Sequence, residues 1–373
     1  MLTFGTGNKA VAMAVRDAKP VVVAAYPITP QTEIVEEIAN FVTDGSLAAR
    51  YIPVESEHSS MAACIGAAAT GVRTFTATSS HGLVYMCEML HMTAGARLPI
   101  VMANANRAIG PGGWNIGAEH SDSISMRDTG WLQVYVSTVQ EAYDATIMAF
   151  RIAEHTNVLL PVMINLDGFL LTHITQTFET VEPGGTSSRR RQPPHAIDIN
   201  NPPGGYGTLT PGDTHFKFRY DIERGMQASI PIIEETEAEF ARRFGREYHL
   251  YEEYRTEDAD VVIIAMGTLG KEMEVAVDIL RNEGIAAGAV RMRWFRPFIT
   301  PPDLDGKDVV VIDRDYSFGY GGVVALELQA KCNCNPFSVI AGLGGQEVTF
   351  DDIAEFVRIR KPGTEHWFGG VDD

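Results

Sequence analysis

The chain has 373 residues, of which 45% are hydrophobic and 9% aromatic, as is typical of a folded protein with two or three domains. Its formal net charge of −18 argues against a nucleic-acid partner, because such binding depends on Lys and Arg neutralising phosphates. No apolar run approaches the roughly 18 residues that a membrane span needs. The N-terminus has no secretory signal pattern. The sequence therefore predicts a soluble cytoplasmic protein without a membrane or nucleic-acid partner.

The first part of the chain alternates apolar strands with helices. We expect strands over 20–25, 50–54, 74–78, 98–103, 134–136 and 158–165. We expect helices over 31–42, 59–70, 83–93 and 140–155, the second of them packed on all sides because it is rich in Ala, Met and Gly. Strands that alternate with helices predict a parallel sheet that is covered on both faces.

Residues 182–213 change in character, because Pro, Gly, Ser and Arg dominate and little apolar area is available to form a core. We interpret this stretch as an extended connection, and its basic run Arg189–Arg191 as solvated in preference to an anion or partner contact. A helix is expected over 221–243, before a second α/β unit that begins near Asp258. The predicted organisation is 1–181 as a first domain, 182–257 as connection and helix, and 258–373 as a second domain.

Four cysteines are present, at Cys64, Cys87, Cys332 and Cys334. None has the CxxC spacing that holds zinc or an iron–sulfur cluster, and the CxC pair at 332 and 334 is a weak signal. Cys64 and Cys87 lie in apolar segments and are expected in the core. If the protein is redox-active, its electron carriers belong to another chain.

Several polar turns follow predicted strands, at the sheet edge where parallel sheets bind ligands. Two prolines flank Thr29 in Tyr26–Pro30, which makes either a rigid turn or a holder for the Thr29 hydroxyl. Glu57 enters an apolar helix, either as an acidic residue at a helix start or as a carboxylate in need of a partner. Ser79–Gly82 opens the next helix, where small polar residues suit an anion or a polar ring.

The segment 104–122 is the most unusual of these turns. Arg107 precedes Gly110-Pro111-Gly112-Gly113-Trp114, and such a loop arginine suits bidentate carboxylate binding, although a solvated arginine is equally compatible with the segment alone. Glu119, His120 and Asp122 fit no metal-ligand spacing, and a polar hydrogen-bonded loop is the preferred interpretation.

The chain lacks the GxGxxG, GxxxxGK[ST] and GxSxG patterns of other nucleotide-binding and hydrolytic sites. It also lacks the Gly-Asp-Gly…Asn signature with which thiamine-diphosphate enzymes hold magnesium and the diphosphate.

Taken in order, the motifs resemble the alpha subunit of the 2-oxoacid:ferredoxin oxidoreductase family, of which pyruvate:ferredoxin oxidoreductase is a member. The matching segments are YPITP (26–30), VESEHSS (54–60), ATSSHGL (77–83), the Arg107 loop, RDTGW (127–131), VQEAYD (139–144), LLPVMINLDGFLLTH (159–173), RPF (296–298) and AGLGG (341–345). The resemblance covers nearly the whole chain.

The resemblance implies a fold and a set of partners. The fold is α/β, with a parallel-sheet domain that binds the pyrimidine of thiamine diphosphate, followed by a transketolase C-terminal-like domain. A beta-type subunit would carry the diphosphate and Mg²⁺, so the cofactor would be shared between chains. Gamma- and delta-type subunits would carry the 4Fe–4S clusters, ferredoxin would accept the electrons, and coenzyme A would accept the acyl group.

The resemblance also assigns roles to individual residues. Glu57 matches the glutamate that hydrogen-bonds the pyrimidine and thereby promotes removal of the thiazolium C2 proton. Thr29 matches the threonine that contacts the substrate, and Arg107 the arginine that pairs with the 2-oxoacid carboxylate. These three are the expected catalytic residues. The other expected cofactor contacts are Pro27, Ile28, Ser80 and His81, and the other expected substrate contacts are Gly112 and Trp114.

The substrate and acceptor stay open at this point. Pyruvate is favoured, but the glycine-rich loop after Arg107 leaves room for a bulkier aryl or branched 2-oxoacid such as phenylglyoxylate. Thr29 argues mildly against an oxalate-type enzyme. NAD is an alternative final acceptor through an additional flavin subunit. A non-catalytic scaffold is the alternative of another class, and the joint presence of Thr29, Glu57 and Arg107 argues against it.

Overall fold

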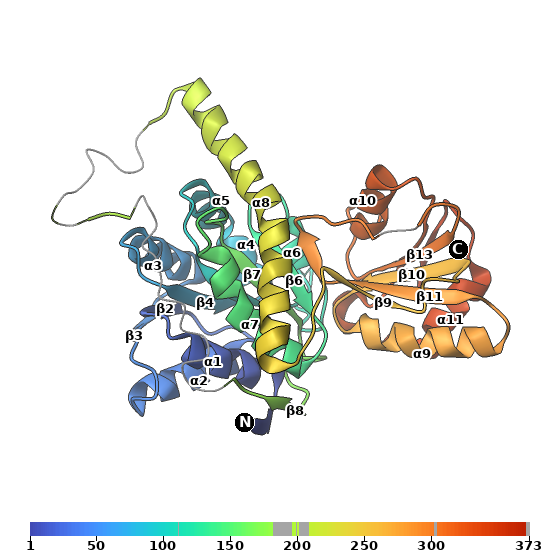
Figure 1. Cartoon of the computed structure of the whole chain (residues 1–373), viewed down its shortest axis with the longest axis horizontal. Helices are drawn as coiled ribbons and strands as arrows, with labels where there is room; N and C mark the ends of the chain where they lie inside the picture. Colours follow the sequence, from blue (N-terminus) through green and yellow to red (C-terminus); the bar gives the residue numbers. More distant parts are fainter. Residues whose placement is uncertain (111, 182–195, 199, 201–208, 302–303, 371–373) are drawn as a thin grey trace.

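The computed structural model describes residues 1–110, 112–181, 196–198, 200, 209–301 and 304–370. Within these ranges, two α/β units lie beside each other, and the long helix α8 (Gly212–Phe244) runs along the first of them (Figure 1). Most of the predicted connection over 182–213, including Arg189–Arg191, lies outside the described residues, as does Pro111.

The first unit contains a seven-stranded sheet in which every neighbouring pair is parallel except the pair at one edge. In spatial order its strands are β12 (Trp294–Arg296), β6 (Leu132–Val136), β7 (Val162–Asp167), β5 (Val101–Asn106), β4 (Thr74–Thr78), β2 (Val22–Ala25) and β3 (Arg50–Pro53). The predicted parallel sheet is thus confirmed. Its antiparallel edge strand, β12, comes from the part of the chain that otherwise forms the second unit.

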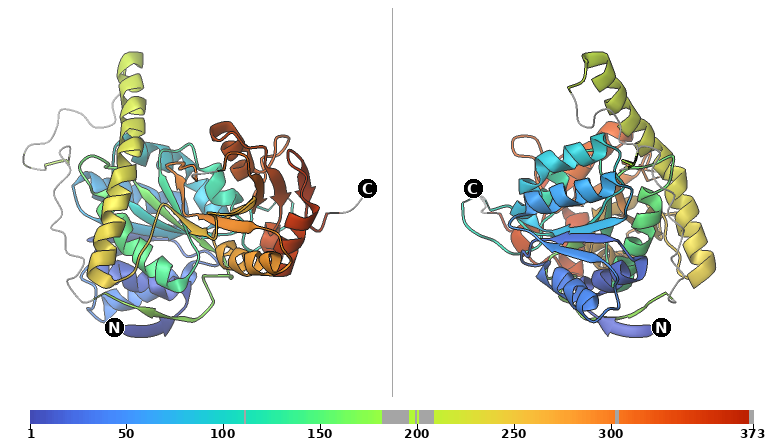
Figure 2. Two further views of the ribbon diagram at one scale, coloured as in Figure 1. Left: turned by 45° about the vertical axis from the view of Figure 1, so that its right-hand side comes forward. Right: turned by 90° about the vertical axis from the view of Figure 1, so that its left-hand side faces the viewer.

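Helices cover both faces of this sheet (Figure 2). One face carries α1 (Gly7–Ala18), α2 (Thr32–Thr43) and α7 (Val139–Ala153), and the other carries α3 (Glu57–Ala69), α4 (Ser80–Tyr85) and α5 (Cys87–Gly95). A short helix, α6 (Ser121–Ser125), follows the long loop after β5, and β1 (Leu2–Gly5) pairs with β8 (Gln176–Glu179). This arrangement gives the first unit two apolar cores, one on each side of the sheet.

Three local predictions need correction. Residues 83–93 form part of two helices, because the chain turns at Met86 between α4 and α5. Helix α3 is not packed on all sides, since Ala62 and Gly66 are exposed. Cys64 is buried as expected, whereas Cys87 is only half-buried.

The second unit is a six-stranded sheet that is also parallel except at one edge. Its strands, in spatial order, are β15 (Glu365–Trp367), β14 (Phe337–Ile340), β13 (Asp308–Asp313), β10 (Val261–Met266), β11 (Ala287–Met292) and β9 (Tyr251–Tyr254). Helices α9 (Leu269–Asn282) and α11 (Phe350–Ile359) cover one face, α10 (Val323–Lys331) covers the other, and a short 3-10 turn, η1 (Leu343–Gly345), follows β14. No helix among the described residues is both long and apolar enough to cross a membrane.

A buried ion network joins the two units beside β12. Arg293 is fully buried and donates to Glu141 of α7 at 2.5 Å and to Glu237 of α8 at 2.6 Å. Burial opposes ionisation of Glu141, but Arg291 and Arg293 outweigh it and lower its pKa to about 2. Because removal of one partner would leave a buried charge alone, this network fixes how the two units meet.

Two carboxyl groups of the second unit are buried together at the end of β13. Asp313 accepts the backbone N–H groups of Val324 and Ala325 at the start of α10, at 2.9 and 3.1 Å. No donor among the described residues contacts either oxygen of Asp315, which is 1% exposed. Burial, and next the charge of Asp313, raise the pKa of Asp315 well above its ordinary range, and burial raises that of Asp313 to about 6.

The Asp313–Asp315 pair predicts a pH dependence of stability. Because both pKa values are raised by folding, the folded protein holds more protons than the unfolded chain, so the free energy of unfolding falls as pH rises from about 4 past 6. Replacing Asp315 by Asn should stabilise the protein at pH 8 by about 1–3 kcal/mol and flatten this slope. Denaturant unfolding at a series of pH values measures both effects. Asp305 is exposed, so Asp305→Asn serves as the control and should leave the slope unchanged. An unchanged slope in Asp315→Asn would show that the Asp313–Asp315 pair does not cause the pH dependence.

Candidate active site

The candidate site residues follow four neighbouring strands of the first sheet. Thr29 follows β2, Glu57 follows β3, Ser80 and His81 follow β4, and Arg107 follows β5. Because these strands are parallel and adjacent, their carboxyl ends meet at one edge of the sheet. The fold thus brings together residues that are far apart in the sequence.

Glu57 is the first residue of α3, directly after the Ser56 side chain that caps this helix. Glu57 is 8% exposed as a whole residue, and its carboxylate takes part in no hydrogen bond among the described residues. A Cβ atom at position 82 would lie 2.6 Å from Glu57 Oε1, so only glycine leaves room beside this oxygen. Glu57 is therefore a nearly buried acid whose side chain packs directly against the Gly82 backbone.

The neighbouring hydroxyl groups also lack partners. Thr78 Oγ1 and Ser79 Oγ are buried without a hydrogen-bond partner among the described residues, and a Cβ at Gly82 would lie 2.7 Å from Thr78 Oγ1. A buried polar atom without a partner is costly, so these oxygens indicate a polar group that completes the site. An acid beside hydroxyl groups fits a flat heterocycle with ring nitrogens and an amino group, such as an aminopyrimidine.

Arg107 lies across this edge, 5% exposed. Its Nη1 donates to the backbone carbonyl of Thr29 at 2.5 Å, and its Nη2 lies 3.5 Å from His81 Nδ1. Burial lowers the pKa of Arg107, while the carboxylates of Asp122 and Glu57 oppose this shift. Its Nε is buried without a partner, so the guanidinium keeps donor capacity for an anion.

Ser80 and His81 connect the helix start to the Arg107 loop. Ser80 adopts a positive φ of 49°, which is uncommon for a residue with a side chain, and its hydroxyl donates to the carbonyl of Ala108 at 2.6 Å. Ser80 Oγ lies 3.1 Å from His81 Nδ1. The His81 and Trp114 rings lie 5.0 Å apart, which places the loop over the helix start.

The remaining predicted contacts lie at the rim. Trp114 is 83% exposed, and a Cβ at Gly112 would meet no atom within 4 Å. Pro27 is exposed and Ile28 half-buried. Their binding roles stay predictions.

Asp122 organises the site and was missed as a functional residue from sequence. This fully buried carboxylate accepts the backbone N–H groups of Ser80 and Arg107, at 3.0 and 3.1 Å, and the side-chain amide of Asn106 at 2.8 Å. Burial raises its pKa, and these hydrogen bonds oppose the shift. Asp122 therefore ties the turn after β4 to the turn after β5.

No metal cluster is found in the described part of the chain, where no three His, Cys, Asp or Glu side chains are grouped to hold an ion. Glu119, His120 and Asp122 instead form the hydrogen-bonded loop that the sequence favours. Cys332 and Cys334 are free and half-buried.

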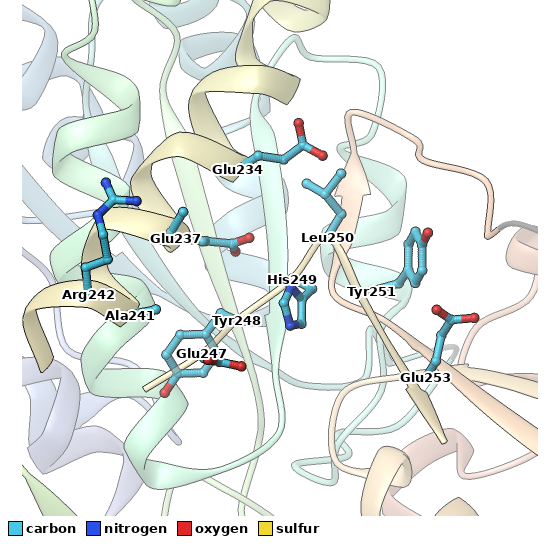
Figure 3. Close-up of a pocket in the computed structure, with 11 residues that line it drawn as sticks. Glu234, Glu237, Ala241, Arg242, Glu247, Tyr248, His249, Leu250, Tyr251 and Glu253 are labelled. Atoms are coloured by element: carbon cyan, nitrogen blue, oxygen red, sulfur yellow. The ribbon is translucent and has the colours of Figure 1, made fainter. Parts of the chain in front are cut away.

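A groove of about 800 Å³ lies away from these residues, between the C-terminal half of α8 and residues 247–253 (Figure 3). Its lining includes the acidic Glu234, Glu247 and Glu253, whereas Glu237 is paired with Arg293. None of the predicted site residues lines this groove. It is a feature of the junction between α8 and the second unit.

Family comparisons cover most of the chain. Residues 13–238 match the family described as "Pyruvate flavodoxin/ferredoxin oxidoreductase, thiamine diP-bdg", and residues 259–353 match "Pyruvate:ferredoxin oxidoreductase core domain II". The pyruvate synthase subunit PorA of Methanothermobacter thermautotrophicus is 44% identical over 368 residues, which are 95% of this chain and 94% of that protein. The ketoisovalerate oxidoreductase subunit VorA of Pyrococcus abyssi is 43% identical over 361 residues, 93% of this chain and 90% of that one.

Solved structures agree on the fold. The 2-oxoglutarate:ferredoxin oxidoreductase of Magnetococcus marinus superposes with a TM-score of 0.72 at 22% identity, over 96% of this chain and 65% of that one. A transketolase of Pichia stipitis superposes with a TM-score of 0.54 at 15% identity, over 95% of this chain and 46% of that one. Both likenesses agree with the predicted α/β fold. With the matched family models and the relatives above 40% identity, they show that the chain belongs to the 2-oxoacid:ferredoxin oxidoreductase family, as an alpha-type subunit.

Proposed function

We propose that this chain supplies the pyrimidine-binding half of a thiamine-diphosphate site that a beta-type subunit completes with the diphosphate and Mg²⁺. The observation that carries the proposal is the nearly buried Glu57, packed against Gly82 and next to the Thr78 hydroxyl, which has no hydrogen-bond partner among the described residues. The absence of a Gly-Asp-Gly…Asn signature supports the division of the site between two chains.

In this proposal the complex decarboxylates a 2-oxoacid oxidatively, forming CO2 and an acyl-CoA. Thiamine diphosphate supplies the electron sink when it is bound. Gamma- and delta-type subunits carry 4Fe–4S clusters that pass the electrons to ferredoxin. Coenzyme A takes the acyl group.

The residues of this chain divide the remaining work. Glu57 holds a proton against a ring nitrogen of the pyrimidine, and its low exposure strengthens this hydrogen bond. Arg107 pairs with the carboxylate of the substrate and is desolvated for that purpose. Thr29, whose carbonyl holds Arg107, offers its hydroxyl to the reacting end of the substrate. His81 lies beside Arg107 and Ser80, with its Nδ1 3.5 Å from Arg107 Nη2 and 3.1 Å from Ser80 Oγ.

Pyruvate is the favoured substrate, and a branched 2-oxoacid is the second candidate. Gly112 and Gly113 are exposed, and a Cβ at either would meet no atom within 4 Å, so this side of the loop sets no close limit on the size of the substrate side chain. Relatives of similar identity are named for pyruvate and for ketoisovalerate.

A substrate panel on the purified complex tests the function and the pocket together. With coenzyme A and an electron-accepting dye, we expect turnover of pyruvate and, within about ten-fold, of 2-oxoisovalerate. Gly112→Val should lower kcat/KM for the branched substrate by about ten-fold and leave that for pyruvate little changed, because a filled pocket rejects the larger side chain. Turnover restricted to pyruvate would contradict the roomy pocket, and no turnover of any 2-oxoacid would contradict the proposed function.

A further inference from the structure

The second unit holds the segment that closes the Arg107 loop. Three successive residues at the end of this loop, 118–120, are each hydrogen-bonded to the second unit. Gly345 N donates to the carbonyl of Ala118, and Gly344 N to Glu119 Oε2, both at 2.9 Å. His120 N donates to the carbonyl of Arg314 at 2.9 Å. The segment 118–120 is therefore fixed from the second unit residue by residue.

The two backbones also approach too closely for any side chain. A Cβ at Gly117 would lie 2.1 Å from the carbonyl oxygen of Gly344, a contact that only a shift of backbone could relieve. Gly344 itself has a φ of 61°, which favours glycine. The turn η1 and the end of the Arg107 loop are thus in direct backbone contact.

A buried charged anchor stands behind this contact. Asp167, at the end of the central strand β7, accepts from His120 Nε2 at 2.6 Å and from Thr268 N at 2.8 Å. Arg314 Nη1 donates to the same carboxylate at 2.9 Å. Burial opposes the ionisation of Asp167, but His120 and Arg314 outweigh it and hold its pKa below the ordinary range. The second unit is therefore attached to the sheet edge by a charged group of the first.

The same segment fixes the start of the loop. Ala108 N donates to the carbonyl of Gly117 at 3.0 Å, which closes the loop at its base, and Arg107 N donates to Asp122 at 3.1 Å. A displacement of residues 117–122 would therefore be transmitted to the backbone that carries the Arg107 guanidinium.

We infer that the second unit is a clamp that positions Arg107 for the substrate carboxylate, with Gly117, Glu119 and Arg314 as positioning residues. The inference rests on the proposed function, since it assigns a role to Arg107. It gives a task at the site to the second unit, in which none of the proposed site residues lies. A loosened clamp should weaken binding of the carboxylate in the ground state and the transition state alike, so KM should rise while kcat changes little.

Two variants open the clamp in different ways. Gly117→Ala inserts a methyl group between the two backbones, and Glu119→Ala removes the acceptor for Gly344 N, whereas Glu119→Gln keeps an oxygen there. In the purified complex we expect Gly117→Ala and Glu119→Ala to raise KM for the 2-oxoacid by about ten-fold or more, with kcat within about two-fold. Glu119→Gln should restore most of the affinity. Gly95→Ala, where a Cβ meets nothing within 4 Å, is the matched control.

Hydrogen–deuterium exchange of the peptides over 107–122 gives a readout that does not depend on turnover. The two clamp-opening variants should exchange faster there than the wild type, and Glu119→Gln and Gly95→Ala should not. Unchanged exchange in both opening variants would overturn the clamp, and faster exchange with an unchanged KM would overturn its role in positioning Arg107. If the wild type turned over no 2-oxoacid, the proposed function would fail, while the exchange data would still decide whether the clamp holds the loop.

Discussion

Glu57→Gln should reduce 2-oxoacid-dependent electron transfer by the assembled complex by about 100-fold or more, because general acid–base contributions are of this size. The amide has nearly the shape of the carboxyl group, so the packing against Gly82 and the start of α3 should be unchanged. What is lost is the carboxyl group that hydrogen-bonds the cofactor ring. Reduction of an electron-accepting dye at saturating 2-oxoacid and coenzyme A measures the effect.

Glu55→Gln is the control for this experiment. Glu55 is two residues away, exposed, and accepts a hydrogen bond from Ser59 in the same turn. This variant should keep nearly full activity, and both variants should co-purify with the partner subunits in wild-type amounts. An assembled Glu57→Gln complex with full activity would refute the role of Glu57.

Arg107→Lys should lower kcat/KM for the 2-oxoacid by about 100-fold, which corresponds to roughly 3 kcal/mol of lost binding. Lysine carries the charge but lacks the planar fork that holds a carboxylate through two bonds. It also loses the geometry in which one guanidinium nitrogen contacts the Thr29 carbonyl and another lies near His81. Most of the loss should appear in KM, and steady-state kinetics over a wide range of substrate concentration separates the two constants.

The exposed Arg50, at the start of β3, provides the matched control. Arg50→Lys should leave both constants unchanged. Equal KM values for the wild type and Arg107→Lys would show that the substrate carboxylate binds elsewhere.

The position of the candidate site could be predicted because it depends on local signals. Each of Thr29, Glu57, His81 and Arg107 comes within four residues of the end of a strand that the sequence predicts. In a parallel sheet the carboxyl ends of neighbouring strands share one edge, so chain order alone places these turns together. The family resemblance then added the chemistry that the turns alone leave open.

The groups that support the site could not be predicted, because their partners are distant in the chain. Asp122 contacts Ser80 across 42 positions, and Asp167 contacts Arg314 across 147. Asp122 lies in a polar segment that is compatible with a solvated loop, and Asp167 precedes Gly168 at a strand end, which is compatible with an ordinary turn. Burial inside the folded protein is what makes these carboxylates important.

Some elements were missed for reasons of pattern. Helix α1 is buried over most of its length and rich in Ala and Val, so it shows little of the polar face that reveals a surface helix. Strand β12 has three residues, and its pairing with β6 joins segments about 160 positions apart. The predicted start of helix α8, at 221, is later than its actual start at Gly212. The first turns carry many polar residues without an apolar stripe, so the sequence pattern does not reveal them as helical.

The most direct test of a divided site is reconstitution from separate subunits. This chain and the beta-type subunit are purified apart, and each is assayed alone and mixed for thiamine-diphosphate-dependent decarboxylation of a 2-oxoacid. We expect that neither chain alone decarboxylates the substrate, that the mixture does, and that Glu57→Gln in this chain removes the activity of the mixture. Decarboxylation by either chain alone, or by a mixture that contains Glu57→Gln, would contradict this expectation.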